Sequence, residues 1–98
     1  MSEANGRDEL AGVRVVDFSA VMSGPYCTRL MADVGADVIK IEPPSGEHSR
    51  SVIPIRDGHS VFYGLLNAGK RSVVLDLRTD EGRDAAAKLI ESADVVVE

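Results

Sequence analysis

The sequence predicts an α/β fold in which parallel strands alternate with helices. The stretch from Val13 to Glu42 holds an apolar run, a turn, an amphipathic segment, a glycine and a second apolar run. This is the layout of a βαβ unit, whose two strands are parallel and whose crossover is right-handed. A second strand–helix–strand pattern follows between Ser72 and Val97. Two such passes are typical of a sheet covered by helices on both faces.

The first unit contains a strand, a helix and a second strand. The β-branched residues of Val13 to Phe18 and the apolar run Asp37 to Glu42 predict two strands that are buried on both faces. Between them a helix is expected to open near Pro25 and to stop before Gly35. Its sheet-facing stripe is predicted from apolar residues at i, i+3, i+4 and i+7, namely Cys27, Leu30, Met31 and Val34.

A longer connection, Pro43 to Ser60, separates the two passes and has the length of a functional or disordered loop. After it we expect a short helix, His59 to Ala68, and a third strand, Ser72 to Leu77. Thr79 is a good N-cap for the next helix. The buried stripe of that helix is predicted from Ala86, Leu89, Ile90 and Ala93, and a fourth strand from Asp94 to Val97.

Composition narrows the class of protein. The formal net charge of −5 argues against a nucleic-acid surface, and no run of about 18 apolar residues predicts a membrane span. The single cysteine, Cys27, makes a reducing compartment the default, so we predict the cytoplasm. Residues 1–9 lack apolar periodicity and are expected to form a flexible tail. The sequence stops as the fourth strand reaches its carboxyl end, which is expected of a fragment.

Ligands of parallel α/β sheets bind beyond the carboxyl ends of the strands. The first turn reads S-A-V-M-S-G-P, with one glycine where dinucleotide binding needs three, so Glu42 is only a weak sign of a ribose-binding acid. His48 and His59 have no partner at ligand spacing, and no metal site is predicted. Cys27 is interpreted as a small buried hydrophobe.

Other polar residues near the strand ends are compatible with either a ligand-binding or a structural role. Asp17 and Asp76 end strands and either reach a ligand or cap the next turn. Ser19 and Ser23 offer hydroxyls without the context of a nucleophile elbow.

Three cations form the strongest chemical signal. Lys70 and Arg71 precede the third strand, and Arg78 follows it and leads into a helix N-terminus. A cation beside a helix N-terminus suits a phosphate or pyrophosphate. Keeping the strand ends solvated explains the same residues equally well.

Two long stretches resemble a known family. L-A-G-V-R-V-V-D-F-S with S-G-P-Y-C-T-R-L-M-A-D-V-G-A-D-V-I-K-I-E-P-P, and later N-A-G-K-R-S-V-V-L-D-L-R-T-D-E-G-R with A-D-V-V-V-E, closely resemble the opening of class III coenzyme A transferases. That family includes formyl-CoA and carnitine CoA-transferases and α-methylacyl-CoA racemases. The resemblance runs from Leu10 to Glu98, through motifs in the same order.

The resemblance implies the N-terminal part, residues 10–98, of a Rossmann-like CoA-binding large domain in an interlocked homodimer. Its transferases move CoA between an acyl-CoA and a free carboxylic acid through an aspartyl-CoA thioester. The family's aspartate lies beyond Glu98, so no catalytic residue is expected in this chain. An acyl-CoA racemase or epimerase of the same family and a non-catalytic nucleotide-binding module are the alternatives.

The resemblance also implies CoA contacts. The matching positions are Met22 and Ser23 after the first strand, and the segment Leu75, Asp76, Leu77 and Arg78. Several members carry an arginine after the second-strand glutamate, where this chain has Pro43. Lys70 or Arg71 is expected to replace that arginine. Formyl-CoA transferases often have glutamine at the Met22 position, which weighs against formyl or oxalyl specificity.

Overall fold

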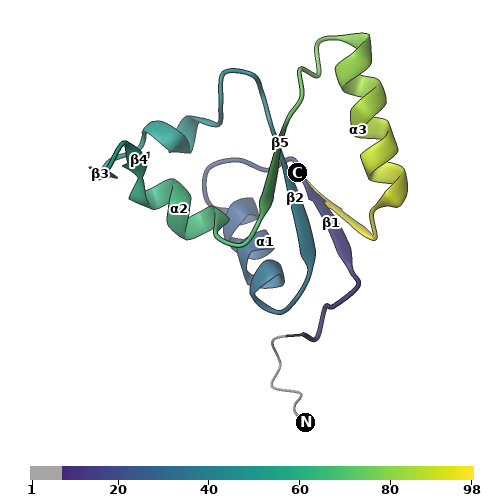
Figure 1. Ribbon diagram of the computed structural model, residues 1–98, viewed down its shortest axis with the longest axis horizontal. Helices are drawn as coiled ribbons and strands as arrows, with labels where there is room; N and C mark the ends of the chain where they lie inside the picture. Colours follow the sequence, from purple (N-terminus) through teal and green to yellow (C-terminus); the bar gives the residue numbers. More distant parts are fainter. Residues whose placement is uncertain (1–7) are drawn as a thin grey trace.

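The computed structural model describes residues 8–98, so most of the predicted tail lies outside the described residues. The predicted α/β class is confirmed, because a parallel sheet of four strands is flanked by helices (Figure 1). In chain order the elements are β1 Arg14–Asp17, α1 Ser23–Asp33, β2 Asp37–Glu42, the 3₁₀ helix η1 His48–Ser51, β3 Ile55–Arg56, β4 His59–Ser60, α2 Val61–Asn67, β5 Arg71–Val74, α3 Asp80–Ser92 and β6 Val95–Val97.

The sheet has the strand order β5-β2-β1-β6, and every neighbouring pair is parallel. Chain order therefore reverses at β1, which has β2 on one side and β6 on the other. Such a switch point opens a crevice beyond the carboxyl ends of the two strands. The loop that follows β1 lies at this position.

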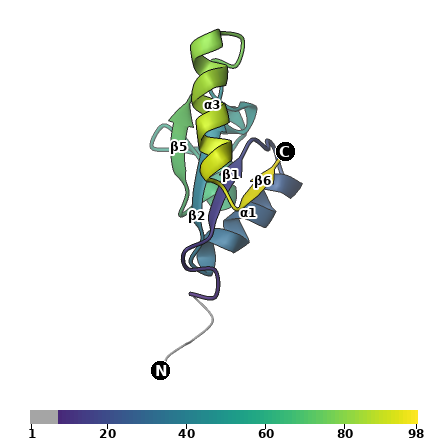
Figure 2. The same cartoon turned by 90° about the vertical axis from the view of Figure 1, so that its right-hand side faces the viewer.

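Two apolar clusters form the core, one on each face of the sheet. Figure 2 shows α3 in front of the sheet and α1 behind it. On the α1 face the buried residues are Val15, Ala36 and Val38, and on the α3 face they are Val16, Ile39 and Ile41. The alternation along β1 and β2 follows from the period of two in a strand, which directs neighbouring side chains to opposite faces.

The α1 face also carries a buried polar layer where the strands reach their carboxyl ends. Lys40 and Glu42 continue the face of Val38, and both are almost completely buried. Lys40 Nζ lies 2.5 Å from Glu47 Oε1, and Lys70 Nζ lies 3.1 Å from Asp17 Oδ2. Each buried cation therefore has a buried carboxylate as its partner, as charges inside a protein require.

Glu42 is the most heavily bonded member of this layer. Arg50 donates to both of its oxygens at 2.7 Å, and Tyr63 donates at 2.6 Å. Ser72 and the backbone N–H of Glu47 donate as well. The hydrogen bonds from Arg50, followed by those from Tyr63, Glu47 and Ser72, outweigh burial and hold the pKa of Glu42 far below its usual value. This carboxylate has no free edge for a ribose.

The expected buried stripe of the first helix is only partly confirmed, because Met31 packs against the core and Val34 is half-buried. Cys27 and Leu30 are exposed, while Pro25 and Thr28 are buried. The Thr28 hydroxyl donates to the buried Asp17 carboxylate at 2.6 Å, which turns this polar position toward the sheet. Apolar periodicity does not register a threonine that is buried for its hydrogen bond.

The second half differs from the prediction mainly at element ends. The third strand ends at Val74 rather than Leu77, because Asp76 accepts from the backbone N–H of Arg78 and turns the chain. In α3, Ala86 is buried as predicted, whereas Ile90 is exposed. The connection 43–60 contains η1 and the β3–β4 hairpin, which periodicity did not predict.

The buried layer predicts that acid destabilises the fold. The pKa of Glu42 is low in the folded state, and the pKa values of Glu47 and Asp17 are lowered as well because hydrogen bonds and cations outweigh burial. Unfolded carboxyls titrate near ~4, so below that pH the unfolded chain binds more protons and stability falls. The denaturation midpoint should be flat above about pH 5 and should decrease below about pH 4. Glu42→Gln should flatten this decrease, and Glu91→Gln, at an exposed site on α3, should not.

Lys70 and Arg71 are adjacent cations, but replacing them should lower the unfolding free energy by very different amounts. Both side chains of the Lys70–Asp17 pair are buried, so Lys70→Met should leave an unpaired buried charge and cost about 3–5 kcal/mol of unfolding free energy. Arg71 is paired with Asp37 on the surface, so Arg71→Met should cost only about 0–1 kcal/mol. Urea denaturation of the two variants measures the difference, and equal costs would contradict the assignment.

Candidate functional site

A cavity of about 620 Å³ lies at the carboxyl edge of the sheet, on the α3 side. Its residues come from the ends of β1, β2 and β5 and from the segments that follow them. They are Phe18, Ile41, Glu42, Pro43, Pro44, Ser45, Leu75, Asp76, Leu77 and Arg78. Apolar walls with a few polar groups at the rim are typical of a small-molecule site.

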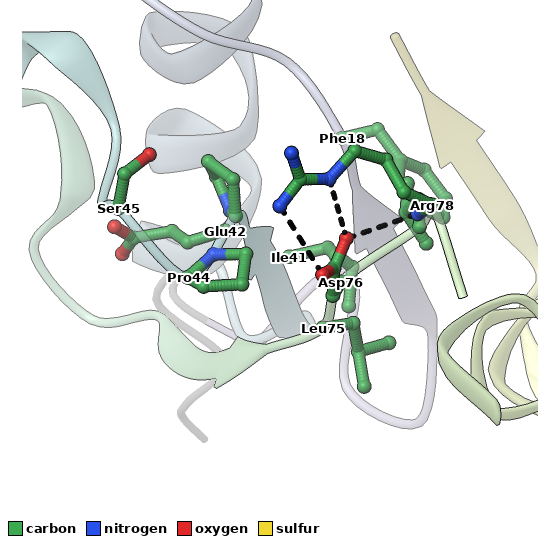
Figure 3. Close-up of a pocket in the computed structure, with 10 residues that line it drawn as sticks. Phe18, Ile41, Glu42, Pro44, Ser45, Leu75, Asp76 and Arg78 are labelled. Carbon is green, nitrogen blue, oxygen red and sulfur yellow. Dashed lines mark hydrogen bonds and ion pairs between the residues drawn. The ribbon is translucent and has the colours of Figure 1, made fainter.

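The arrangement of the cavity follows from how the strands end. Two consecutive prolines follow β2, and the last ladder bond runs from the Leu75 N–H to the Glu42 carbonyl at 3.0 Å. Beyond this bond the segment that follows β2 and the segment that follows β5 diverge. Figure 3 shows Pro44 and Ser45 on one side of the opening, and Asp76 and Arg78 on the other.

Arg78 is the cation at the rim. Its Nε donates to Asp76 at 3.0 Å and its Nη2 at 3.3 Å, while the side chain remains 86% exposed. The hydrogen bond from Arg78 lowers the pKa of Asp76, and the carboxylate raises the pKa of Arg78. A guanidinium has five N–H donors, so Arg78 keeps donors for an anionic ligand while Asp76 fixes its direction.

Sequence reasoning missed Gly82, which holds this segment close to α3. Thr79 caps α3 by accepting from the Gly82 N–H at 3.0 Å. A Cβ on Gly82 would overlap the backbone carbonyl of Asp76. The first turn of the helix therefore packs directly against the turn that presents Arg78. The glycine after T-D-E was the available signal, but helix patterns alone give it no role.

The other predicted site residues lie elsewhere. Met22 and Ser23 are exposed at the start of α1, outside the cavity lining. Lys70 is buried under α1, where burial lowers its pKa and Asp17 offsets part of that effect. Arg71 lies near the amino end of the sheet, where its guanidinium binds Asp37 at 2.7 and 3.0 Å. Of the three cations, only Arg78 lines the cavity.

Two other site types can be assessed in the described residues. Within residues 8–98 there is no group of three His, Cys, Asp or Glu side chains that could hold a metal ion. No helix in the same range combines the length and apolar character needed to cross a membrane.

Known proteins share this architecture. A CAIB/BAIF family protein from Brucella suis matches with a TM-score of 0.84 and 38% identity, over 90% of this chain and 25% of that chain. A hypothetical protein from Mycobacterium tuberculosis matches with a TM-score of 0.84 and 37% identity, over 93% and 25%.

Curated relatives are similar over the same region. A succinyl-CoA:mesaconate CoA-transferase from Haloarcula hispanica is 52% identical over 94 residues, and a formyl-CoA:oxalate CoA-transferase from Escherichia coli is 46% identical over 91. Each alignment covers 91% of this chain but only 24% and 22% of the relative, so the chain spans about a quarter of their length. The model of CoA-transferase family III matches residues 10–98. The chain therefore belongs to CoA-transferase family III.

Proposed function

We propose that this chain is the CoA-binding N-terminal segment of an enzyme that moves CoA between an acyl-CoA and a free carboxylic acid. The observation that carries the proposal is the cavity, which combines apolar walls with the exposed guanidinium of Arg78. A nucleotide offers a flat apolar ring beside anionic phosphates, and both halves have a counterpart here. Family membership and the named activities of the relatives support the same assignment.

The contacts we propose for CoA are the segment Leu75–Arg78 together with Met22 and Ser23. Leu75 supplies apolar wall, and Arg78 supplies the charge for a phosphate. Lys70 and Arg71 are left out of the proposed contacts because of where they lie: the Lys70 side chain is buried against Asp17, and Arg71 binds Asp37 near the amino end of the sheet, away from the cavity. Pro43 stands where the family resemblance implies an arginine in several members, and it lines the cavity. Arg78 is therefore the only cation of the cavity lining among the described residues.

The reaction we propose is covalent transfer through an aspartate outside these 98 residues. Its carboxylate attacks the acyl-CoA carbonyl, which gives a mixed anhydride and CoA thiolate. The thiolate attacks the aspartyl carbonyl, releases the first acid and forms an aspartyl-CoA thioester. The acceptor carboxylate reverses both steps, so one difficult exchange becomes several easier ones. Asp17 is unsuited to this role, because Ser19, Thr28 and Lys70 occupy its oxygens.

The remaining features of the proposal concern the whole enzyme. We propose an interlocked homodimer because of the family resemblance. We propose a cytoplasmic location because the sequence has a single cysteine, which makes a reducing compartment the default. Acyl-CoA and carboxylic acid are its proposed substrates. The chain supplies the nucleotide end of the site in this arrangement.

Isotope exchange separates this function from its alternatives. In the complete protein that contains this chain, labelled succinate should enter succinyl-CoA if CoA transfer occurs. Exchange of the α-proton of a 2-methylacyl-CoA in deuterated water, without label transfer, would instead establish a racemase. CoA binding with neither exchange would support a non-catalytic nucleotide-binding module.

The cavity assignment predicts a specific effect of Arg78. Arg78→Ala should weaken CoA binding on the order of tenfold to a hundredfold, because a charge-assisted hydrogen bond contributes about 1.5–3 kcal/mol. Arg78→Lys should retain most of the affinity. Arg56→Ala removes an exposed arginine on β3, outside the cavity lining, and it should leave CoA affinity unchanged. Calorimetric titration with CoA measures all three, and equal affinities for wild type and Arg78→Ala would refute the assignment.

A further inference from the structure

The buried Lys40–Glu47 ion pair binds the backbone of the loop between β1 and α1, residues 18–22. Lys40 Nζ donates to the Ser19 carbonyl at 3.2 Å and lies 2.5 Å from Glu47 Oε1. Glu47 Oε2 accepts from the backbone N–H of Val21 at 3.3 Å. The Lys40 and Glu47 side chains are 1% and 5% exposed, so water does not compete for these bonds.

Val21 adopts a conformation that its side chain disfavours. Its φ is +75°, in the left-handed region where a β-branched residue is a true outlier. Such strain persists only where surrounding contacts over-determine it, and it is concentrated at functional sites. Here the over-determining contacts are the hydrogen bond that Lys40 donates to the Ser19 carbonyl and the one that the Val21 N–H donates to Glu47.

The strained residue lies next to the proposed ligand contacts. Met22 and Ser23 follow Val21 directly, at the carboxyl edge beside the switch point of the sheet. Met22 is 57% exposed, so its direction is set by the backbone rather than by packing. Gly24 then packs against Ser19, where a Cβ would overlap the serine side chain. The loop is thus fixed at both ends and strained in between.

We propose that the Lys40–Glu47 pair is a positioning device that holds Val21 in its strained conformation, so that Met22 and Ser23 face the bound acyl-CoA. This inference rests on the proposed function. Neither Lys40 nor Glu47 touches the ligand in this arrangement. Glu47 comes from the connection 43–60, which acquires a defined role in shaping the first loop of the site.

A paired substitution tests the device in the complete protein. Lys40→Met with Glu47→Leu removes both charges together, and replacing a buried ion pair by apolar residues is often neutral for stability. The KM for succinyl-CoA should rise on the order of tenfold while kcat changes less, because a misplaced binding loop is costly. Adding Val21→Gly should lower this KM again, since glycine adopts positive φ without strain. Val21→Gly alone is the matched control and should leave the KM close to that of wild type.

The rescue distinguishes positioning from simple structural support. A lower melting temperature with an unchanged KM, or a raised KM that Val21→Gly does not lower, would overturn the proposal. If the paired variant fails to fold, Glu47→Gln with and without Val21→Gly is read by the same rescue criterion. Wild-type protein that does not bind CoA would overturn the proposed function and this inference with it. Wild-type binding with no effect of the pair would overturn this inference alone.

Discussion

The buried Asp17–Lys70 ion pair is the interaction on which the rest of the structure depends. Lys70 Nζ contacts the Asp17 carboxylate, the Pro25 carbonyl at 3.0 Å and Asn67 Oδ1 at 2.7 Å. One ammonium group therefore joins the end of β1, the first turn of α1 and the end of α2. Because a buried charge without its partner is costly, these segments must assemble together. The Thr28 hydroxyl also donates to the Asp17 carboxylate, and this bond fixes the rotation of α1 about its axis.

The two faces of the sheet have separate tasks. On the α1 face the polar residues of β2 draw the connection 43–60 inward, through Glu47 and Arg50. The first residues of the same connection, Pro43–Ser45, line the cavity at the carboxyl edge. The connection thus contributes to both faces of the sheet, and its polar contacts through Glu47 reach the loop that carries Met22.

The three cations around β5 differ in position rather than in pairing, because each of them is bonded to an aspartate. Lys70 neutralises a buried aspartate, Arg71 binds Asp37 on the surface, and Arg78 extends from the cavity rim. Sequence spacing did not distinguish among the three cations, because it does not reveal that the partner of Lys70 is 53 residues away. Arg71 and Arg78 are each bonded to one aspartate through Nε and Nη2, so what distinguishes Arg78 is its place at the cavity rim.

The sequence by itself determined the parallel α/β fold and the helix start at Thr79, because these depend on local periodicity and capping. The segment Leu75–Arg78, which the family resemblance indicated as a CoA contact, lines the cavity, and that contact stays a prediction. The sequence did not determine which face of the first helix is buried, since Thr28 is buried for a hydrogen bond to Asp17 rather than for its hydrophobicity. The strained Val21 and the buried Lys40–Glu47 pair were equally hidden. Only the tertiary structure decided these features, because each depends on a buried polar partner that is remote in the chain.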